Sequence, residues 1–109
     1  MPTIYKVLGQ VNPAATTNTT LYTVPAATQS VISTISICNQ AGTSATYRIA
    51  IRVAGSALSA EEYIVYGATV AASDSVLLTL GITLAATDVV TVFASSATLS
   101  FNAFGSEIS

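Results

Sequence analysis

Apolar and small polar residues alternate with a period of two along much of this chain. The alternation is clearest in residues 45–53, where Tyr47 and Ile49 fall on one face and Arg48 and Arg52 on the other. Successive side chains of a strand point to opposite faces, so this spacing is that of a half-buried antiparallel strand. Both arginines are expected to be solvated or to pair with carboxylates of a neighbouring strand or subunit.

Similar runs recur at short intervals, and Gly, Pro, Asn, Asp or Ser residues bound each of them. About eight short strands with turns between them are typical of an antiparallel sandwich or jelly roll. Helical composition is limited to residues 57–62, where Ser59 and Glu62 have the spacing of a capping box around one turn. We therefore predict one all-β domain over residues 1–109, an antiparallel β-sandwich with a jelly-roll-like arrangement. The expected strands are residues 4–11, 21–24, 31–39, 45–53, 62–66, 75–80, 89–94 and 98–104.

The chain has one cysteine, Cys38, so it forms no intrachain disulfide. In the strand expected at residues 31–39, Val31, Ile35 and Ile37 share one face and Cys38 falls on the other. No basic residue lies nearby in the sequence to activate the thiol. We expect a buried structural cysteine.

Charge is scarce throughout the chain. Only eight of the 109 residues are charged, and none lies between Lys6 and Arg48. A typical soluble domain carries roughly 25% charged residues, and this share is 7% here. Charge normally keeps a domain apart from its neighbours, and several strands carry apolar residues on both faces, as at residues 76–78. We therefore expect an oligomer rather than a monomer, with both faces of such strands covered.

Composition also excludes several classes of partner. Three basic residues and a net charge of −2 cannot neutralise a row of phosphates, so we expect no nucleic acid. No run approaches the roughly 18 consecutive apolar residues of a spanning helix. Residues 1–6 lack a basic region followed by an apolar stretch. The chain is expected to be neither exported nor inserted into a membrane.

The sequence gives little indication of a catalytic or metal site. The chain has no histidine, and the adjacent Glu61 and Glu62 would point to opposite faces of a strand. Asp74 and Asp88 fall in turns, and Glu107 has no partner that the sequence identifies. We expect no enzyme, cofactor, metal or small-molecule substrate. A calcium site built from Asp74, Asp88 and turn carbonyls stays open, although no Asp-x-Asp spacing favours it.

The tyrosines are expected to serve in the core or in cross-strand pairs. Tyr22, Tyr47, Tyr63 and Tyr66 alternate with aliphatic residues, as such positions do. Some of them would still suit a groove that stacks on sugars. A small carbohydrate-binding module is therefore the alternative from a different class, and it predicts a monomer with an exposed tyrosine groove.

Several segments carry a likeness to a known group of proteins. They are LYTVP at residues 21–25, the stretch 31–39 ending in ICN, ATYRIAIR at 45–52, GITL at 81–84, DVVTV at 88–92 and FNAFG at 101–105. Together they resemble small virion structural proteins of tailed bacteriophages, especially phages of cyanobacteria and other aquatic bacteria. The likeness extends over residues 19–108 and implies a virion component, made in the host cytoplasm, with no catalytic residue.

Proteins of this kind are assigned to capsid surfaces and to tail or neck parts. Among these roles we expect a capsid decoration (cement) protein, a homotrimer that binds the major capsid protein at capsomer junctions. A tail, neck or fibre component is the alternative. Residues 1–20 are expected to form an N-terminal strand and an arm or loop that adds a strand to a neighbour. The contacts with subunits or capsid are assigned to Ile4, Tyr5, Leu8, Tyr22 and Phe104.

Overall fold

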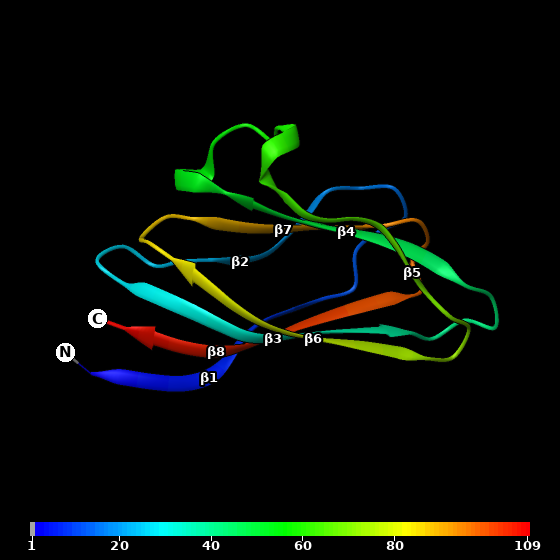
Figure 1. Cartoon of the computed structure of the whole chain (residues 1–109), viewed down its shortest axis with the longest axis horizontal. Coiled ribbons are helices and arrows are strands. Elements are labelled where there is room, and N and C mark those ends of the chain that lie inside the picture. The colour runs from blue at the N-terminus through cyan, green and yellow to red at the C-terminus, as the bar shows by residue number, and fades with distance from the viewer. Residues whose placement is uncertain (1) are drawn as a thin grey trace.

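The computed structural model describes residues 2–109, apart from the side chain of Leu80, as two four-stranded antiparallel sheets packed face to face (Figure 1). Sheet A has the strand order β1-β8-β3-β6, and sheet B has the order β2-β7-β4-β5. The predicted β-sandwich is confirmed. The elements are β1 Thr3–Val11, β2 Thr19–Thr23, β3 Gln29–Asn39, β4 Ala45–Arg52, η1 Val53–Gly55, η2 Ala60–Glu62, β5 Tyr63–Val70, β6 Ser75–Leu84, β7 Val89–Ala94 and β8 Leu99–Ile108.

The first half of the chain pairs with the second half in reverse order. β1 pairs with β8, β2 with β7, β3 with β6 and β4 with β5, all antiparallel. The further pairs β3–β8 and β4–β7 complete the two sheets. This nested arrangement is a jelly roll. It brings the first and last strands side by side, with both termini at one end of the sandwich (Figure 1).

The core lies between the two sheets. Tyr47 of β4 meets Phe101 of β8 edge to face, with ring centroids 6.2 Å apart. The predicted inward face of β4 is confirmed, because Tyr47 and Ile49 are both buried. Burying a large apolar side chain stabilises a fold by about 1.5–3 kcal/mol. The most deeply buried large side chains include Ile32, Ile35, Ile37, Ile49, Leu99, Phe101, Val24, Val70, Val90 and Val92.

A bulge in β3 changes which of its residues face the core. The register of β3 against both neighbours shifts between Ile32 and Thr34. As a result Ile32 is fully buried with Ile35 and Ile37, whereas Val31 is only partly buried. The prediction that placed Val31 on the core face was wrong, because a bulge inserts an extra residue that an unbroken period of two does not anticipate.

Cys38 is partly exposed rather than buried. Its neighbours Ile37 and Asn39 are buried, so the alternation of the strand turns Cys38 to the outer face of sheet A. The prediction of a buried structural cysteine was therefore wrong.

Three strands run well beyond their predicted ends. β5 extends to Val70, β6 to Leu84 and β8 to Ile108. In each case a glycine that favours a turn in the sequence lies inside the strand instead: Gly67, Gly81 and Gly105. Of these, Gly67 has a positive φ of 78°, which accommodates a bulge. The predicted helical turn is present as the short 3-10 segment η2, with the Ser59–Glu62 capping box.

The N-terminal segment belongs to the sandwich. β1 pairs with β8 along its length, and the following loop is held by the side chain of Asn12, which donates to the carbonyls of Ala97 and Leu99. The Thr16 N–H also donates to the Ala94 carbonyl at 2.8 Å. Residues 1–20 were expected to supply a strand and an arm or loop; in the described part, residues 2–20, the strand and loop are present, and the addition of a strand to a neighbour stays a prediction.

Both helical segments are three-residue 3-10 turns. Over residues 2–109, no helix combines the length and the apolar character that crossing a bilayer requires.

Gly105 lies where β8 and β3 approach each other too closely for a larger side chain. A Cβ at this position would collide with the backbone carbonyl of Val31, whereas a Cβ at Gly42 would meet nothing within 4 Å. Overpacking of this kind costs about 1–3 kcal/mol, and β8 cannot move aside because it is paired on both edges. We expect Gly105→Ala to lower the free energy of unfolding in urea by about 2 kcal/mol. The control Gly42→Ala should change it by less than about 1 kcal/mol; equal midpoints for the two variants would contradict this packing.

Candidate functional site

Sheet A presents an outer face without charge. Its four strands contain two charged residues, Lys6 and Glu107. These two form an ion pair, with Lys6 Nζ 3.1 Å from Glu107 Oε1. Glu107 also accepts a hydrogen bond from Tyr22 of sheet B, so the pair lies on the inner side of sheet A. No charged side chain is left for the outer face.

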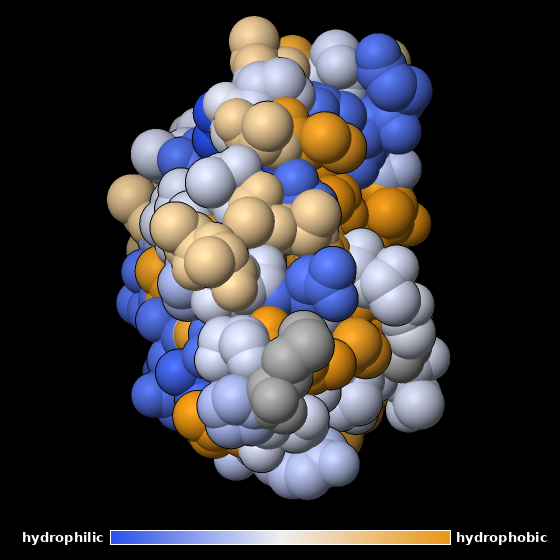
Figure 2. Space-filling model, turned by 90° about the vertical axis from the view of Figure 1, so that its left-hand side faces the viewer, coloured by the Kyte–Doolittle hydropathy of each residue, from blue (hydrophilic) through white to orange (hydrophobic). Residues whose placement is uncertain are grey.

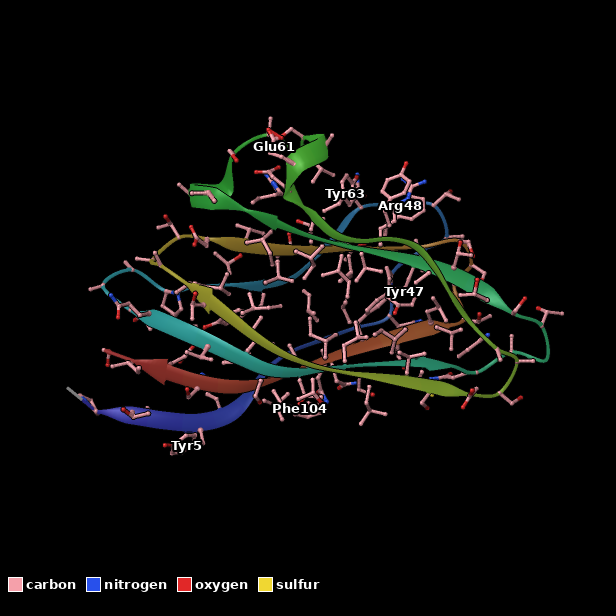
Figure 3. The ribbon with its side chains drawn as sticks, in the orientation of Figure 1. Tyr5, Tyr47, Arg48, Glu61, Tyr63 and Phe104 are labelled. Carbon is pink, nitrogen blue, oxygen red and sulfur yellow. The ribbon has the colours of Figure 1, made fainter. Side chains whose placement is uncertain are left out.

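Large apolar side chains are exposed on this outer face, which we call the apolar face. Tyr5 is 84% exposed, Leu77 65%, Val7 47% and Phe104 37%. Figure 3 shows Tyr5 and Phe104 on the side of sheet A that points away from sheet B. Tyr5, Val7 and Phe104 line an open depression of about 470 Å³ with Val31, Ser33, Gly105, Ser106 and, at its edge, Lys6, whose ammonium group is paired with Glu107. Exposed apolar patches of this kind mark contact surfaces.

The end of the sandwich that carries both termini has a mixed surface. In Figure 2, orange apolar atoms reach the surface between pale, weakly polar ones, and blue hydrophilic residues lie between and beside them.

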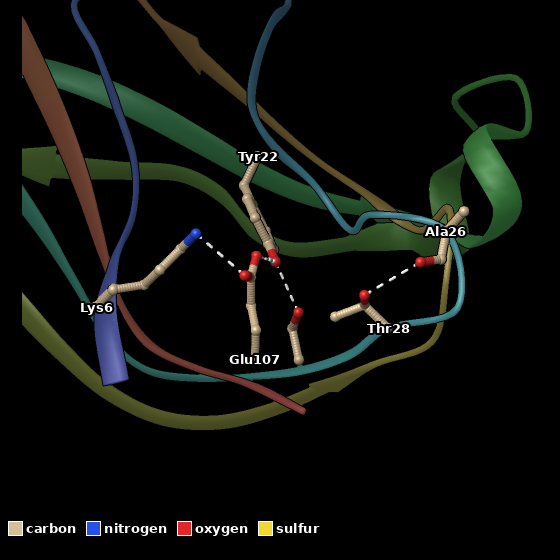
Figure 4. A network of polar contacts seen from close by, with 6 residues as sticks. Lys6, Tyr22, Ala26, Thr28 and Glu107 are labelled. Atoms are coloured by element: carbon tan, nitrogen blue, oxygen red, sulfur yellow. Dashed lines mark hydrogen bonds and ion pairs between the residues drawn. The ribbon is translucent and has the colours of Figure 1, made fainter. Parts of the chain in front are cut away.

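A polar network on the inner side of sheet A joins this sheet to sheet B. The Tyr22 hydroxyl donates to Glu107 Oε2 at 2.5 Å and accepts from Ser30 Oγ at 2.7 Å (Figure 4). Burial, followed by the hydrogen bond to Glu107, raises the pKa of Tyr22 to about 12. The Tyr22 hydroxyl, and then Lys6, lower the pKa of Glu107. The sequence identified no partner for Glu107, because its two partners, Lys6 and Tyr22, lie far away in the chain.

The five predicted contact residues divide into two groups. Leu8 and Tyr22 are buried members of the core, so the structure assigns them to packing and corrects their placement in a contact surface. Ile4, Tyr5 and Phe104 are exposed, and their role in contacts stays a prediction.

A second surface lies on the outer face of sheet B. The guanidinium carbon of Arg48 lies 4.3 Å from the ring centroid of Tyr66 and 4.3 Å from that of Phe93. Tyr66 in turn packs edge to face against Tyr63, with centroids 4.9 Å apart. We call these four side chains the aromatic ladder. Figure 3 shows Tyr63 and Arg48 on the side of the sandwich opposite Tyr5 and Phe104.

Two bulges in β5 put the tyrosines on the same face. Residues three apart in a regular strand point to opposite faces. The β4–β5 register pairs Arg48 with Tyr66 and Ala50 with Tyr63, and it leaves Ile64 and Gly67 without partners on β4. These irregularities turn both tyrosine rings outward. Simple alternation misses this pair; the only sequence signal is Gly67 directly after Tyr66.

A depression of about 710 Å³ adjoins the aromatic ladder. Part of its wall comes from the segment between β4 and β5, which Glu62 holds in place. The Glu62 carboxylate accepts hydrogen bonds from the Ser59 N–H at 2.9 Å and from the Ser56 hydroxyl at 2.8 Å. The depression is lined by Asn18, Leu58, Ser59, Ala60, Tyr63 and Tyr66.

The arginines of β4 do not pair as expected. In the part of the chain that the structure describes, the only ion pair joins Lys6 and Glu107. Arg52 instead donates to the carbonyls of Gly55 and Ser56, and Arg48 is held between two rings. Of the alternatives given for the arginines, pairing with a carboxylate of a neighbouring strand does not occur in the described residues, and pairing with a subunit stays a prediction.

The aspartates hold backbone groups in their turns. Asp88 accepts the N–H of Ala54 and of Ala85, each at 2.9 Å, and Asp74 accepts the N–H of Ser75. Among residues 2–109, no three His, Cys, Asp or Glu side chains gather as ligands of a metal would.

The chain matches no protein-family model and no curated protein. The resemblance to phage virion proteins therefore stays a prediction from short segments of the sequence.

The Tyr22 network predicts a loss of stability in alkali. Tyr22 has a higher pKa in the folded state than its ordinary value of 10.0, so its contribution is complete below about pH 10 and is lost as the pH rises through about 12. A shift of this size corresponds to about 3 kcal/mol. We expect the free energy of unfolding, measured by denaturant titration from about pH 8 to 12, to fall more steeply for the natural chain than for Tyr22→Phe.

Burial also raises the pKa of Tyr47, and that residue adds the same alkaline slope to both proteins. If the free energy of unfolding fell equally with pH for the natural chain and for Tyr22→Phe, the Tyr22 hydroxyl would not be hydrogen-bonded to Glu107 in the way described above.

Proposed function

We propose that this chain is a structural subunit of a tailed-phage virion. Within the virion it acts as a capsid decoration protein, a homotrimer that binds the major capsid protein at capsomer junctions after synthesis in the host cytoplasm. The observation that carries the proposal is the apolar face of sheet A. That face exposes Tyr5, Val7, Leu77 and Phe104 and has no charge of its own.

An uncharged face is suited to being covered by protein. Burying a charge without a partner is costly, and the central parts of protein interfaces are depleted of charged residues and enriched in tyrosine and phenylalanine. Serine and threonine, which supply much of the remaining surface here, leave water at a lower cost than ions do. Many copies acting together stabilise a shell even when each single contact is weak.

The fold is compatible with this role. Jelly rolls occur in viral capsid and lectin domains, but a fold does not by itself determine function. The proposal therefore depends on the apolar face and on the resemblance of the sequence segments to virion proteins.

A tail, neck or fibre position would use the same face against a different partner. Immunogold labelling of virions from the phage that encodes the chain distinguishes these positions. The proposal predicts gold over the whole capsid surface. Gold confined to the tail or neck would replace the decoration role with the alternative, and unlabelled virions would overturn both.

Two exposed tyrosines on opposite faces provide a matched test of the docking surface. Tyr5 lies on the apolar face and Tyr66 in the aromatic ladder, and they are 84% and 65% exposed. We expect Tyr5→Ser to weaken binding to capsids stripped of the protein by at least about tenfold, as loss of an aromatic anchor does. Tyr66→Ser should bind as the natural chain does. The reverse pattern in a co-sedimentation assay would place the docking surface on sheet B.

A further inference from the structure

We infer that the outer face of sheet B holds a binding site for a neutral saccharide, with Tyr66 as the ring on which a sugar stacks. This site lies on the face opposite the proposed docking surface, so it goes beyond the structural role in the virion. Its components are the aromatic ladder and the adjoining depression of about 710 Å³.

The exposure of Tyr66 is the first observation that points to a ligand. This side chain is 65% exposed even though the Arg48 guanidinium covers one of its faces at 4.3 Å. A ring so exposed contributes little to the hydrophobic core. It does present a broad apolar surface to solvent, and the C–H face of a sugar ring can stack on such a surface.

The second observation is that the ring is held in place before any ligand arrives. Arg48 stacks on one face of Tyr66, and Tyr63 packs edge to face against the same ring. A side chain that is already fixed loses little conformational entropy on binding, which favours affinity. Arg48 and Tyr63 are positioning residues in this account.

The third observation is the irregular backbone around Tyr66. One bulge lies on each side of it, at Ile64 and at Gly67, where φ is 78°. Bulges re-aim side chains and are frequent beside functional sites. A regular β5 would pair with β4 equally well but would turn one of the two tyrosines into the core.

The lining of the depression selects the class of ligand. Asn18 supplies an amide, Ser59 a hydroxyl and the tyrosines phenolic groups, and all of these can donate and accept hydrogen bonds. Leu58 and Ala60 add apolar surface beside them. None of the six lining residues is acidic or basic, and the guanidinium of the adjoining Arg48 is already held between the rings of Tyr66 and Phe93. A molecule with many hydroxyls and one apolar face matches this set better than an anion or a cation does.

The shape of the site favours an extended ligand. The depression is open to solvent along the surface of sheet B, whereas sites for isolated small molecules are usually enclosed and mainly apolar. An oligosaccharide lying across the sheet can contact the tyrosines and the loop segment together.

The test is a titration of the purified chain with four neutral oligosaccharides: maltohexaose, cellohexaose, chitohexaose and mannohexaose. Binding is measured by calorimetry, and the contacted residues are located from amide chemical shifts. We expect at least one of them to bind with a dissociation constant of about 1 mM or tighter, with the shifts centred on β5 and residues 56–62.

Two variants test whether the saccharide binds at Tyr66. Tyr66→Ser should weaken this binding by at least about tenfold, because it removes the stacking ring while leaving the core intact. Tyr5→Ser, on the opposite face, should bind the saccharide as the natural chain does.

Three outcomes would overturn the saccharide site. They are no binding of any of the four oligosaccharides, equal binding by Tyr66→Ser, and tighter binding of hexagalacturonate than of every neutral probe. Loss of self-association or capsid binding in Tyr66→Ser, without any saccharide binding, would instead identify the aromatic ladder as a protein contact. The capsid experiment with Tyr5→Ser uses the other face, so failure of one proposal is distinguishable from failure of the other.

Discussion

The two charged residues of sheet A are bound to each other on its inner side, and the account of this protein depends on that arrangement. Lys6 comes from the first strand and Glu107 from the last, and Tyr22 of sheet B completes the network. The network joins the two ends of the chain and links the sheets. It also leaves the outer face of sheet A with apolar and uncharged polar side chains, and this is the surface that we propose is covered in the virion.

The two outer faces of the sandwich have different characters. Sheet A exposes apolar residues, which suits a broad contact with protein. Sheet B carries an ordered group of three aromatic rings and one arginine, placed by two bulges in β5. Because the faces are opposite, a copy attached through sheet A would present the aromatic ladder to the surroundings. One small domain can thus both attach to a particle and offer a binding surface.

Much of the fold could be predicted from alternation and turn residues, because those signals are local. β7 has its predicted bounds, and the inward face of β4 is as expected. The errors arose where the backbone departs from a regular strand. Because of the bulge in β3, Ile32 rather than Val31 faces the core. The bulges in β5 put Tyr63 and Tyr66 on the same face of sheet B. The partner of Glu107 could not be found, since Lys6 and Tyr22 reach it only through the nested strand pairing, which spacing along the chain does not reveal.

We propose that this charge-poor chain works as a homotrimer, in which other copies cover part of its apolar surface. The most direct test is the mass of the purified protein in solution, measured by light scattering after size exclusion, at moderate salt and several concentrations. A stable homotrimer has a mass three times the 11.1 kDa of one chain, unchanged on dilution. A mass of 11.1 kDa at every concentration would contradict it.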